Sequence, residues 1–247
     1  MKWVQLLMVL VVLGFSNARA ESPALKETCS ELDAMWEKRG AGGYGAEAIA
    51  KAKSLSQAYP NSYDAQWQYG RVLFWDCFTS TDNAKRAKVC KQGWDYSKRA
   101  TELNSSGVEG YYMVSLNVGT YANAVGVMTA VREGLAGEIE QSALRAAELD
   151  PKYDGAGPHR VLGRYYQNLP WPMKDTEKAK YHYDSSIKLA PGKAINWLYI
   201  AEYYIYMEQP EEAKKALNTL LDPNYKVTDQ SSYIKAKPKA EKLLKGL

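Results

Sequence analysis

The sequence contains few of the residues that metal centres and most hydrolytic active sites require. Only two histidines, His159 and His182, and three cysteines occur in 247 residues, and none of them lies at a recognisable metal-ligand spacing. The sequence also lacks a Gly-x-Ser-x-Gly elbow, a phosphate-binding P-loop and a Rossmann glycine fingerprint. We therefore expect no metal, no cofactor and no enzymatic activity, and we assign His159 a helix-capping or surface role.

The sequence also has no large excess of positive or negative charge. Lysine and arginine total 32 and aspartate and glutamate total 28, so the formal net charge is only +4, and Lys2 and Arg19 near the N-terminus contribute two of these charges. A nucleic-acid-binding protein normally presents a strongly basic face. The balance therefore predicts that nucleic acid is not a partner.

Long apolar runs are confined to the N-terminus. Lys2 precedes a nearly continuous apolar stretch from Trp3 to Phe15, and Ala18-Arg19-Ala20 has the form of a signal-peptidase site. The run is short for a membrane span, so a cleavable signal peptide over residues 1–20 is expected, with a retained anchor as the alternative. No cysteine follows the predicted cleavage site, which argues against a lipid anchor. We expect a periplasmic protein.

The three cysteines are Cys29, Cys77 and Cys90. In an oxidising compartment this odd number predicts one disulfide and one further thiol. Cys77 and Cys90 are the expected pair, because the turn at residues 79–83 would fold their two helices antiparallel. The alternative is that all three cysteines stay reduced.

Almost the whole chain carries helical patterning, since long alternating β-branched runs are absent and Gly, Pro and Asn-Ser clusters recur at the spacing of helix hairpins. Asn83 and Asp175 are expected helix caps. Gly126, Gly134 and Gly137 are expected to bend or split the long helical stretch 121–149, and Pro238 to break the C-terminal helix. The predicted helices span residues 25–38, 45–58, 63–78, 83–103, 108–119, 121–149, 159–167, 175–189, 194–207, 210–220 and 233–247.

A repeated sequence motif relates these helices to one another. An alanine-rich amphipathic stretch ends in proline at Leu149-Asp150-Pro151 and again at Leu189-Ala190-Pro191, and an aromatic-rich helix follows each time. The second copy, Trp197-x-x-Ile200-Ala201-x-x-Tyr204, resembles the tetratricopeptide repeat. We predict an all-α, tetratricopeptide-like superhelix of about five helix hairpins with terminal helices, forming a single domain over residues 21–247.

The tetratricopeptide-like pattern also predicts how its small and large residues pack. The small residues Gly163 and Ala201 are expected where the two helices of a hairpin cross closely. The large residues three positions later, Tyr166 and Tyr204, are expected to fill the groove against the next helix.

A more specific resemblance covers roughly Tyr69 to Pro223. Its ordered motifs are Val108-Glu109-Gly110-Tyr111-Tyr112 with Asn117 and Gly119, then Leu149-Asp150-Pro151-x-Tyr153-x-Gly155-Ala156-Gly157-Pro158-x-Arg160, then Leu169-Pro170-x-Pro172, and finally Asn196 with Ala201-Glu202. Together they resemble the T component of tripartite ATP-independent periplasmic (TRAP) transporters. Members of that family can be lipoproteins, and this chain departs from them in its cleavage site.

The resemblance implies an all-helical protomer with a cleft or pore, homotrimer formation, and association with the transporter's periplasmic solute-binding protein. It implies a non-enzymatic adaptor that helps to hand over a small organic ligand; a general tetratricopeptide scaffold for protein–protein interaction in the cell envelope is the alternative. The candidate binding residues are Tyr111, Tyr112, Asn117, Arg160, Asn196 and Glu202, each of which could instead link successive repeats. The lysines of the C-terminal tail are expected to solvate a capping helix.

Overall fold

The computed structural model describes residues 22–42 and 44–247, and the predicted signal peptide, residues 1–20, lies outside these ranges. The described residues are helical and contain no strand. Within them, no helix combines the length and the hydropathy that a membrane span needs. The α-helices and one 3-10 helix, η1, are α1 (Pro23–Glu37), η1 (Arg39–Ala41), α2 (Ala46–Ala58), α3 (Tyr63–Thr79), α4 (Asn83–Leu103), α5 (Val108–Val125), α6 (Val127–Arg132), α7 (Leu135–Leu149), α8 (Tyr153–Asn168), α9 (Thr176–Leu189), α10 (Ala194–Tyr206), α11 (Pro210–Leu221) and α12 (Gln230–Lys245).

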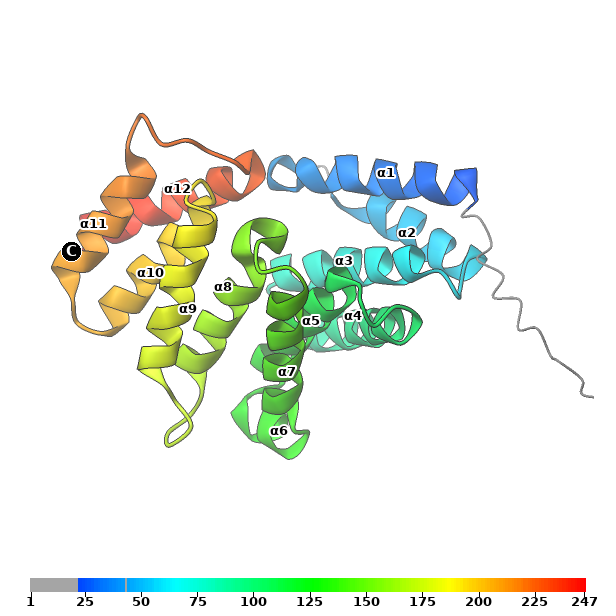
Figure 1. Cartoon of the computed structure of the whole chain (residues 1–247), viewed down its shortest axis with the longest axis horizontal. Coiled ribbons are helices and arrows are strands. Elements are labelled where there is room, and N and C mark those ends of the chain that lie inside the picture. The colour runs from blue at the N-terminus through cyan, green and yellow to red at the C-terminus, as the bar shows by residue number, and fades with distance from the viewer. Residues whose placement is uncertain (1–21, 43) are drawn as a thin grey trace, which may run out of the picture.

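The helices pair in five hairpins, which confirms the predicted tetratricopeptide-like superhelix. The contacting pairs are α1 with α2, α3 with α4, α5 with α7, α8 with α9, and α10 with α11, while α6 is a short insertion and α12 is terminal. The N-terminal helices occupy one side of Figure 1 and α8–α12 the other. The first helices of four hairpins, α3, α5, α8 and α10, form the inner surface together with the terminal helix α12.

The superhelix closes on itself. The end of α1 and the start of α12 meet at the top of Figure 1. The hydroxyl of Ser231 in α12 donates a hydrogen bond to the carbonyl oxygen of Glu37 in α1. A methyl group at Gly40 would lie only 2.6 Å from the carbonyl oxygen of Ser231, so glycine is required for this close approach. The first and last helices therefore seal one end of the inner surface.

Several predicted helix boundaries are wrong for identifiable reasons. Asp82, and not Asn83, caps α4, because its carboxylate accepts the N–H groups of Ala84 and Lys85. The long stretch 121–149 is split by glycines, as expected, but α5 continues to Val125, so the predicted helix end at Gly119 is wrong. The chain then breaks at Gly126 (φ 84°) and Gly134 (φ 67°), conformations that favour glycine. Gly137, in contrast, lies inside α7.

The C-terminal helix also differs from expectation. α12 continues through Pro238 instead of breaking there. Proline cannot supply the N–H group that the carbonyl of Ile234 would accept. Ile234 is exposed, so water can solvate this carbonyl. The predicted cap Asp175 is confirmed, because its carboxylate accepts the N–H of Lys178 at 2.9 Å.

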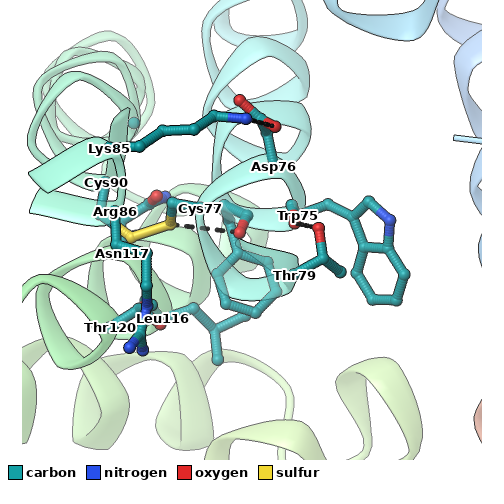
Figure 2. The surroundings of a disulfide bond; sticks show 12 residues. Trp75, Asp76, Cys77, Thr79, Lys85, Arg86, Cys90, Leu116, Asn117 and Thr120 are labelled. Carbon is teal, nitrogen blue, oxygen red and sulfur yellow. Dashed lines mark hydrogen bonds and ion pairs between the residues drawn. A yellow bond between two sulfur atoms is a disulfide. The ribbon is translucent and has the colours of Figure 1, made fainter. Parts of the chain in front are cut away.

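Cys77 of α3 and Cys90 of α4 form a disulfide that links the two helices. Both cysteines are fully buried. Figure 2 shows this bond beside Leu116, Asn117 and Thr120 of α5. The disulfide fixes the end of α3 against α4. This matters for the inner surface, because the last turns of α3 carry large aromatic side chains.

The packing roles of the small residues follow the predicted pattern. A methyl group at Gly163 in α8 would lie 2.6 Å from the ring of Tyr183 in α9, so the two helices cross as closely as glycine permits. Ala201 is fully buried, and Tyr166 and Tyr204 pack into or against the same apolar core. This core joins α8–α12, whereas a second one joins α1–α4.

Candidate functional site

A cleft of about 600 Å³ lies along the inner surface. Its lining comes from each of the inner helices α3, α5, α8, α10 and α12, together with the end of α1, η1, α6, α7 and the loop between α8 and α9. This volume falls within the range of small-molecule sites in proteins. The cleft is therefore the concave surface on which the superhelix can bind a ligand.

Most of the cleft wall is apolar. The end of α3 contributes aromatic side chains, and α5, α7, α8 and α10 contribute aliphatic ones. The principal apolar lining residues are Phe74, Trp75, Phe78, Leu116, Leu135, Ile139, Val161 and Leu198. Such a wall binds an apolar surface by removing it from water.

An ionic network forms one part of the lining, and Asp154 of α8 lies at its centre. Its carboxylate accepts hydrogen bonds from Tyr112 of α5 at 2.7 Å, from Arg160 at 2.8 Å and from Lys193 at 2.8 Å. Burial alone would raise the pKa of Asp154, but the charges of Lys193 and Arg160 outweigh it and hold the pKa well below its usual range. Asp154 is therefore ionised and joins α5, α8 and the start of α10.

The backbone around Asp154 is built for this network. Asp154, Gly155 and Ala156 adopt left-handed conformations with φ values of 47°, 62° and 61°. The carbonyl oxygens of Asp154 and Gly155 are directed toward Arg160, which donates to that of Gly155 at 3.2 Å. Asn196 of α10 donates to the same oxygen at 3.1 Å. Side chains from two helices thus stabilise a backbone conformation that non-glycine residues rarely adopt.

A second carboxylate, Asp229, extends the network to the ends of the chain. It accepts from Arg39 of η1 at 2.5 Å and from Lys193 at 2.7 Å. Burial would raise the pKa of Asp229, but Lys193 and further hydrogen bonds lower it. Lys193 therefore bridges Asp154 and Asp229, and the closed end of the superhelix is held by buried charges.

Of the sequence-predicted residues, Tyr112 and Arg160 line the cleft. Arg160 uses its guanidinium on partners within the protein, among them Asp154, Asn196 and the Tyr112 hydroxyl, to which it donates at 3.0 Å. Burial and the nearby Asp154 raise the pKa of Tyr112, so its hydroxyl stays protonated. Both side chains contribute polar atoms to the wall, and both also connect neighbouring helices.

The other four predicted residues are not part of the cleft lining. Asn117 is fully buried and donates to the carbonyl oxygens of Gly70 and Met113 and to the hydroxyl of Ser97, so it links α3, α4 and α5. Asn196 donates to backbone carbonyls of α8 and α9 and to the turn after α9.

Glu202 and Tyr111 make contacts of a different kind. Glu202 accepts from Arg164 at 2.7 Å and forms an ion pair with Lys239 of α12. Tyr111 lies beside a smaller pocket, where the guanidinium of Arg145 is 6.0 Å from its ring. The structure therefore gathers Tyr112, Arg160 and Asn196 in one network and leaves Tyr111, Asn117 and Glu202 outside it.

Sequence reasoning missed Lys235 of α12, which lines the cleft with its ammonium 4.1 Å from the centre of the Trp75 ring. Burial and the nearby Arg39 lower its pKa. The sequence prediction places the lysines of the C-terminal tail on a solvated surface. A signal was present in the sequence, because positions 232, 235, 236 and 239 have the spacing of one helix face, and all four line the cleft.

His159 does not cap α8, because it lies within the helical turns that follow the left-handed residues 154–156. Its Nδ1 lies 3.0 Å from Nδ1 of His182 in α9, and the His182 ring stacks on Tyr166. Burial lowers the pKa of both histidines, and for His182 the neighbouring His159 and Lys178 add to this effect and bring the pKa to about 4. In the described part of the chain, no group of three or more potential ligands could hold a metal ion.

Comparison with known proteins gives one informative match. No curated protein is significantly similar to this sequence. Two crystal structures of MamA share 19% sequence identity and a TM-score of 0.46 with it, over 85% and 88% of this chain and 95% and 96% of theirs. The family profile of the TRAP transporter T-component matches residues 75–247, which include all of α4 to α12 and most of the cleft lining. The chain therefore belongs to the T-component family of TRAP transporters.

Proposed function

We propose that this TRAP transporter component is a non-enzymatic periplasmic adaptor that binds the transporter's solute-binding protein and helps to hand over a small ligand. The observation that carries the proposal is the apolar cleft of about 600 Å³ on the inner surface. A cleft of this kind can hold an apolar or amphipathic molecule while it passes between two proteins. Five of the six cationic side chains in the cleft lining are engaged in ion pairs within the protein, which suits a structural and positioning role.

The exposed apolar side chains around the cleft support a partner surface. Met128 in α6 is 84% exposed and Trp171 in the α8–α9 loop is 88% exposed. Their neighbours Val127, Val131 and Met173 are also exposed and line the cleft. Both segments lie at the lower edge of Figure 1. Exposed apolar groups that gather around an opening are typical of protein–protein contact sites, and a partner bound there would cover the mouth of the cleft.

The test is affinity capture of the protein from its native periplasm, followed by mass spectrometry and by titration of the captured solute-binding protein. We expect one dominant solute-binding protein. Met128→Lys should weaken its binding by about tenfold or more, because the change places a charge in an apolar contact. Leu144→Lys is the control, since Leu144 is an exposed apolar residue outside the cleft lining.

A diverse set of envelope proteins without a solute-binding protein would overturn the proposal. That result would favour the alternative, a general tetratricopeptide scaffold. Equal weakening by Met128→Lys and Leu144→Lys would retain the partner but reject the mouth of the cleft as its binding surface.

A further inference from the structure

The charges around the cleft are unbalanced. Six cationic side chains line it, and the carboxylates that pair with them number only three. The cations are Arg39, Arg160, Arg164, Lys193, Lys235 and Lys239, and the carboxylates are Asp154, Asp229 and Glu202. An excess of positive charge beside an apolar wall attracts anions to that position.

Lys235 differs from the other five cations. Each of the others forms an ion pair with at least one of the three carboxylates, whereas Lys235 forms none within the described residues. Its ammonium instead lies 4.1 Å from the centre of the Trp75 ring. The ring holds the side chain in the cleft but provides no hydrogen-bond acceptor, so the donors of Lys235 remain available to a ligand.

Other candidates for recognising an anion are less suitable. Arg160 directs both terminal nitrogens at acceptors in the protein. Arg39 donates to Asp229 and to the carbonyl oxygen of Trp36. An anion that bound either arginine would have to displace a carboxylate or a carbonyl oxygen. Binding at Lys235 displaces no protein partner, and the neighbouring charge of Arg39 adds to the attraction.

The apolar wall continues from this position. Trp75 belongs to the same helical turns as Phe74 and Phe78, and all three line the cleft. Leu116 of α5 and Ile139 of α7 also belong to the apolar lining. A ligand held at Lys235 by one end therefore has apolar side chains along which the remainder can lie.

We propose that the cleft binds an amphipathic anion whose charged head group pairs with Lys235 and whose apolar body lies along the wall formed by α3, α5 and α7. This inference deepens the proposed function, since it rests on the same cleft being the ligand site. It defines the ligand class by one negative charge at one end of a hydrocarbon body. It also identifies Lys235 as the residue that distinguishes anionic from neutral ligands.

The experiment is displacement of Nile red, a neutral apolar dye, from the mature protein at pH 7 by decanoate and by 1-decanol. The two competitors share the hydrocarbon body and differ in charge. We expect decanoate to bind about tenfold more tightly, which corresponds to about 1.4 kcal/mol. Lys235→Met, which removes the charge and keeps an unbranched apolar side chain, should abolish this preference, and Lys235→Arg, which keeps the charge, should preserve it.

Lys237→Met is the matched control, because Lys237 lies on the same helix, outside the cleft lining. This variant should keep the full preference for decanoate. Equal affinity for decanoate and decanol in the wild type, displacement by neither, or an unchanged preference in Lys235→Met would overturn the inference. Lys235 is exposed, so circular dichroism should show that each variant is folded.

Capture of the solute-binding protein provides a separate readout. If capture succeeds and decanoate shows no preference, the adaptor function stands and the anion site is rejected. If decanoate binds through Lys235 and no solute-binding protein is captured, the ligand site stands and the adaptor function is rejected.

Discussion

Replacement of Asp154 by asparagine should destabilise the protein strongly, although it changes a single atom of the side chain. Asn tolerates the left-handed conformation that Asp154 adopts, so the backbone imposes no new strain. The change removes the charge that Lys193 and Arg160 both approach at 2.8 Å, and it leaves these cations in a largely buried environment. The substitution therefore measures the electrostatic role of the carboxylate.

The size of the effect follows from the burial of the partners. The side chains of Arg160 and Lys193 are only 9% and 7% exposed, and that of Asp154 is 22% exposed. Breaking a buried ion pair costs about 3–5 kcal/mol. The amide oxygen of Asn still accepts one hydrogen bond, so we expect a loss of about 3 kcal/mol in the free energy of unfolding. For a protein of this size that corresponds to a decrease in Tm of roughly 6–12 °C.

The assay is urea unfolding followed by circular dichroism, with Asp184→Asn as the control. Asp184 forms an exposed pair with Lys180, which contributes at most about 0.5 kcal/mol. The pKa of Asp154 in the folded state lies below its ordinary value of 3.8. Its stabilising effect is therefore complete at neutral pH and decreases as the pH falls below about 4. A loss as small as that of Asp184→Asn, or one that does not shrink in acid, would refute the reasoning.

Three further predictions concern the framework that holds the cleft. Reduction of the Cys77–Cys90 disulfide should cost about 3 kcal/mol because it opens a loop with a sequence separation of 13; a reductant should lower the Tm of the wild type but not of the doubly Cys→Ala variant. The pKa of His182 is lowered to about 4, so as the pH falls the unfolded chain protonates this histidine before the folded protein does. The free energy of unfolding should therefore decrease by about 1–2 kcal/mol between pH 7.5 and 5. His182→Gln should flatten this pH dependence in urea unfolding. Gly163→Ala should destabilise by about 1–3 kcal/mol through overpacking, whereas Gly137→Ala, a helix position with open space around it, should stabilise by about 0.5–1 kcal/mol in the same unfolding assay.

Sequence patterning was sufficient for most of the helices and for their pairing, because both depend on short-range periodicity and on turn residues. The caps show where such reasoning fails. Asp82 and Asn83 are adjacent and chemically similar, and only the observed hydrogen bonds identify Asp82 as the cap of α4. Pro238 shows a second kind of failure. Its effect on α12 depends on whether the freed carbonyl is solvated, and that exposure is a property of the folded chain.

The motif around Gly155 and Arg160 could be recognised from the sequence, but its physical purpose could not. Gly155 provides a left-handed residue, and Gly157 allows Tyr112 to approach so closely that a methyl group there would lie 2.5 Å from the tyrosine hydroxyl. Arg160 then donates hydrogen bonds to the turn and to Asp154. The left-handed turn and the ion pair of Arg160 thus stabilise each other. The spacing of these residues along the chain does not show that Asp154 is the carboxylate at their centre.

The same limitation explains why Lys235 was assigned to a solvated surface. Arg39 and Asp229 are separated by 190 positions, and their ion pair helps to bring α12 against the N-terminal helices. Once the superhelix is closed, one face of α12 is directed into the cleft, and Lys235 reaches Trp75 of α3. A terminal helix of an open superhelix would direct that face to solvent. The role of Lys235 therefore depends on ring closure, and a variant that disturbs closure without a change of charge, such as Gly40→Ala, should weaken decanoate binding without altering Lys235 itself.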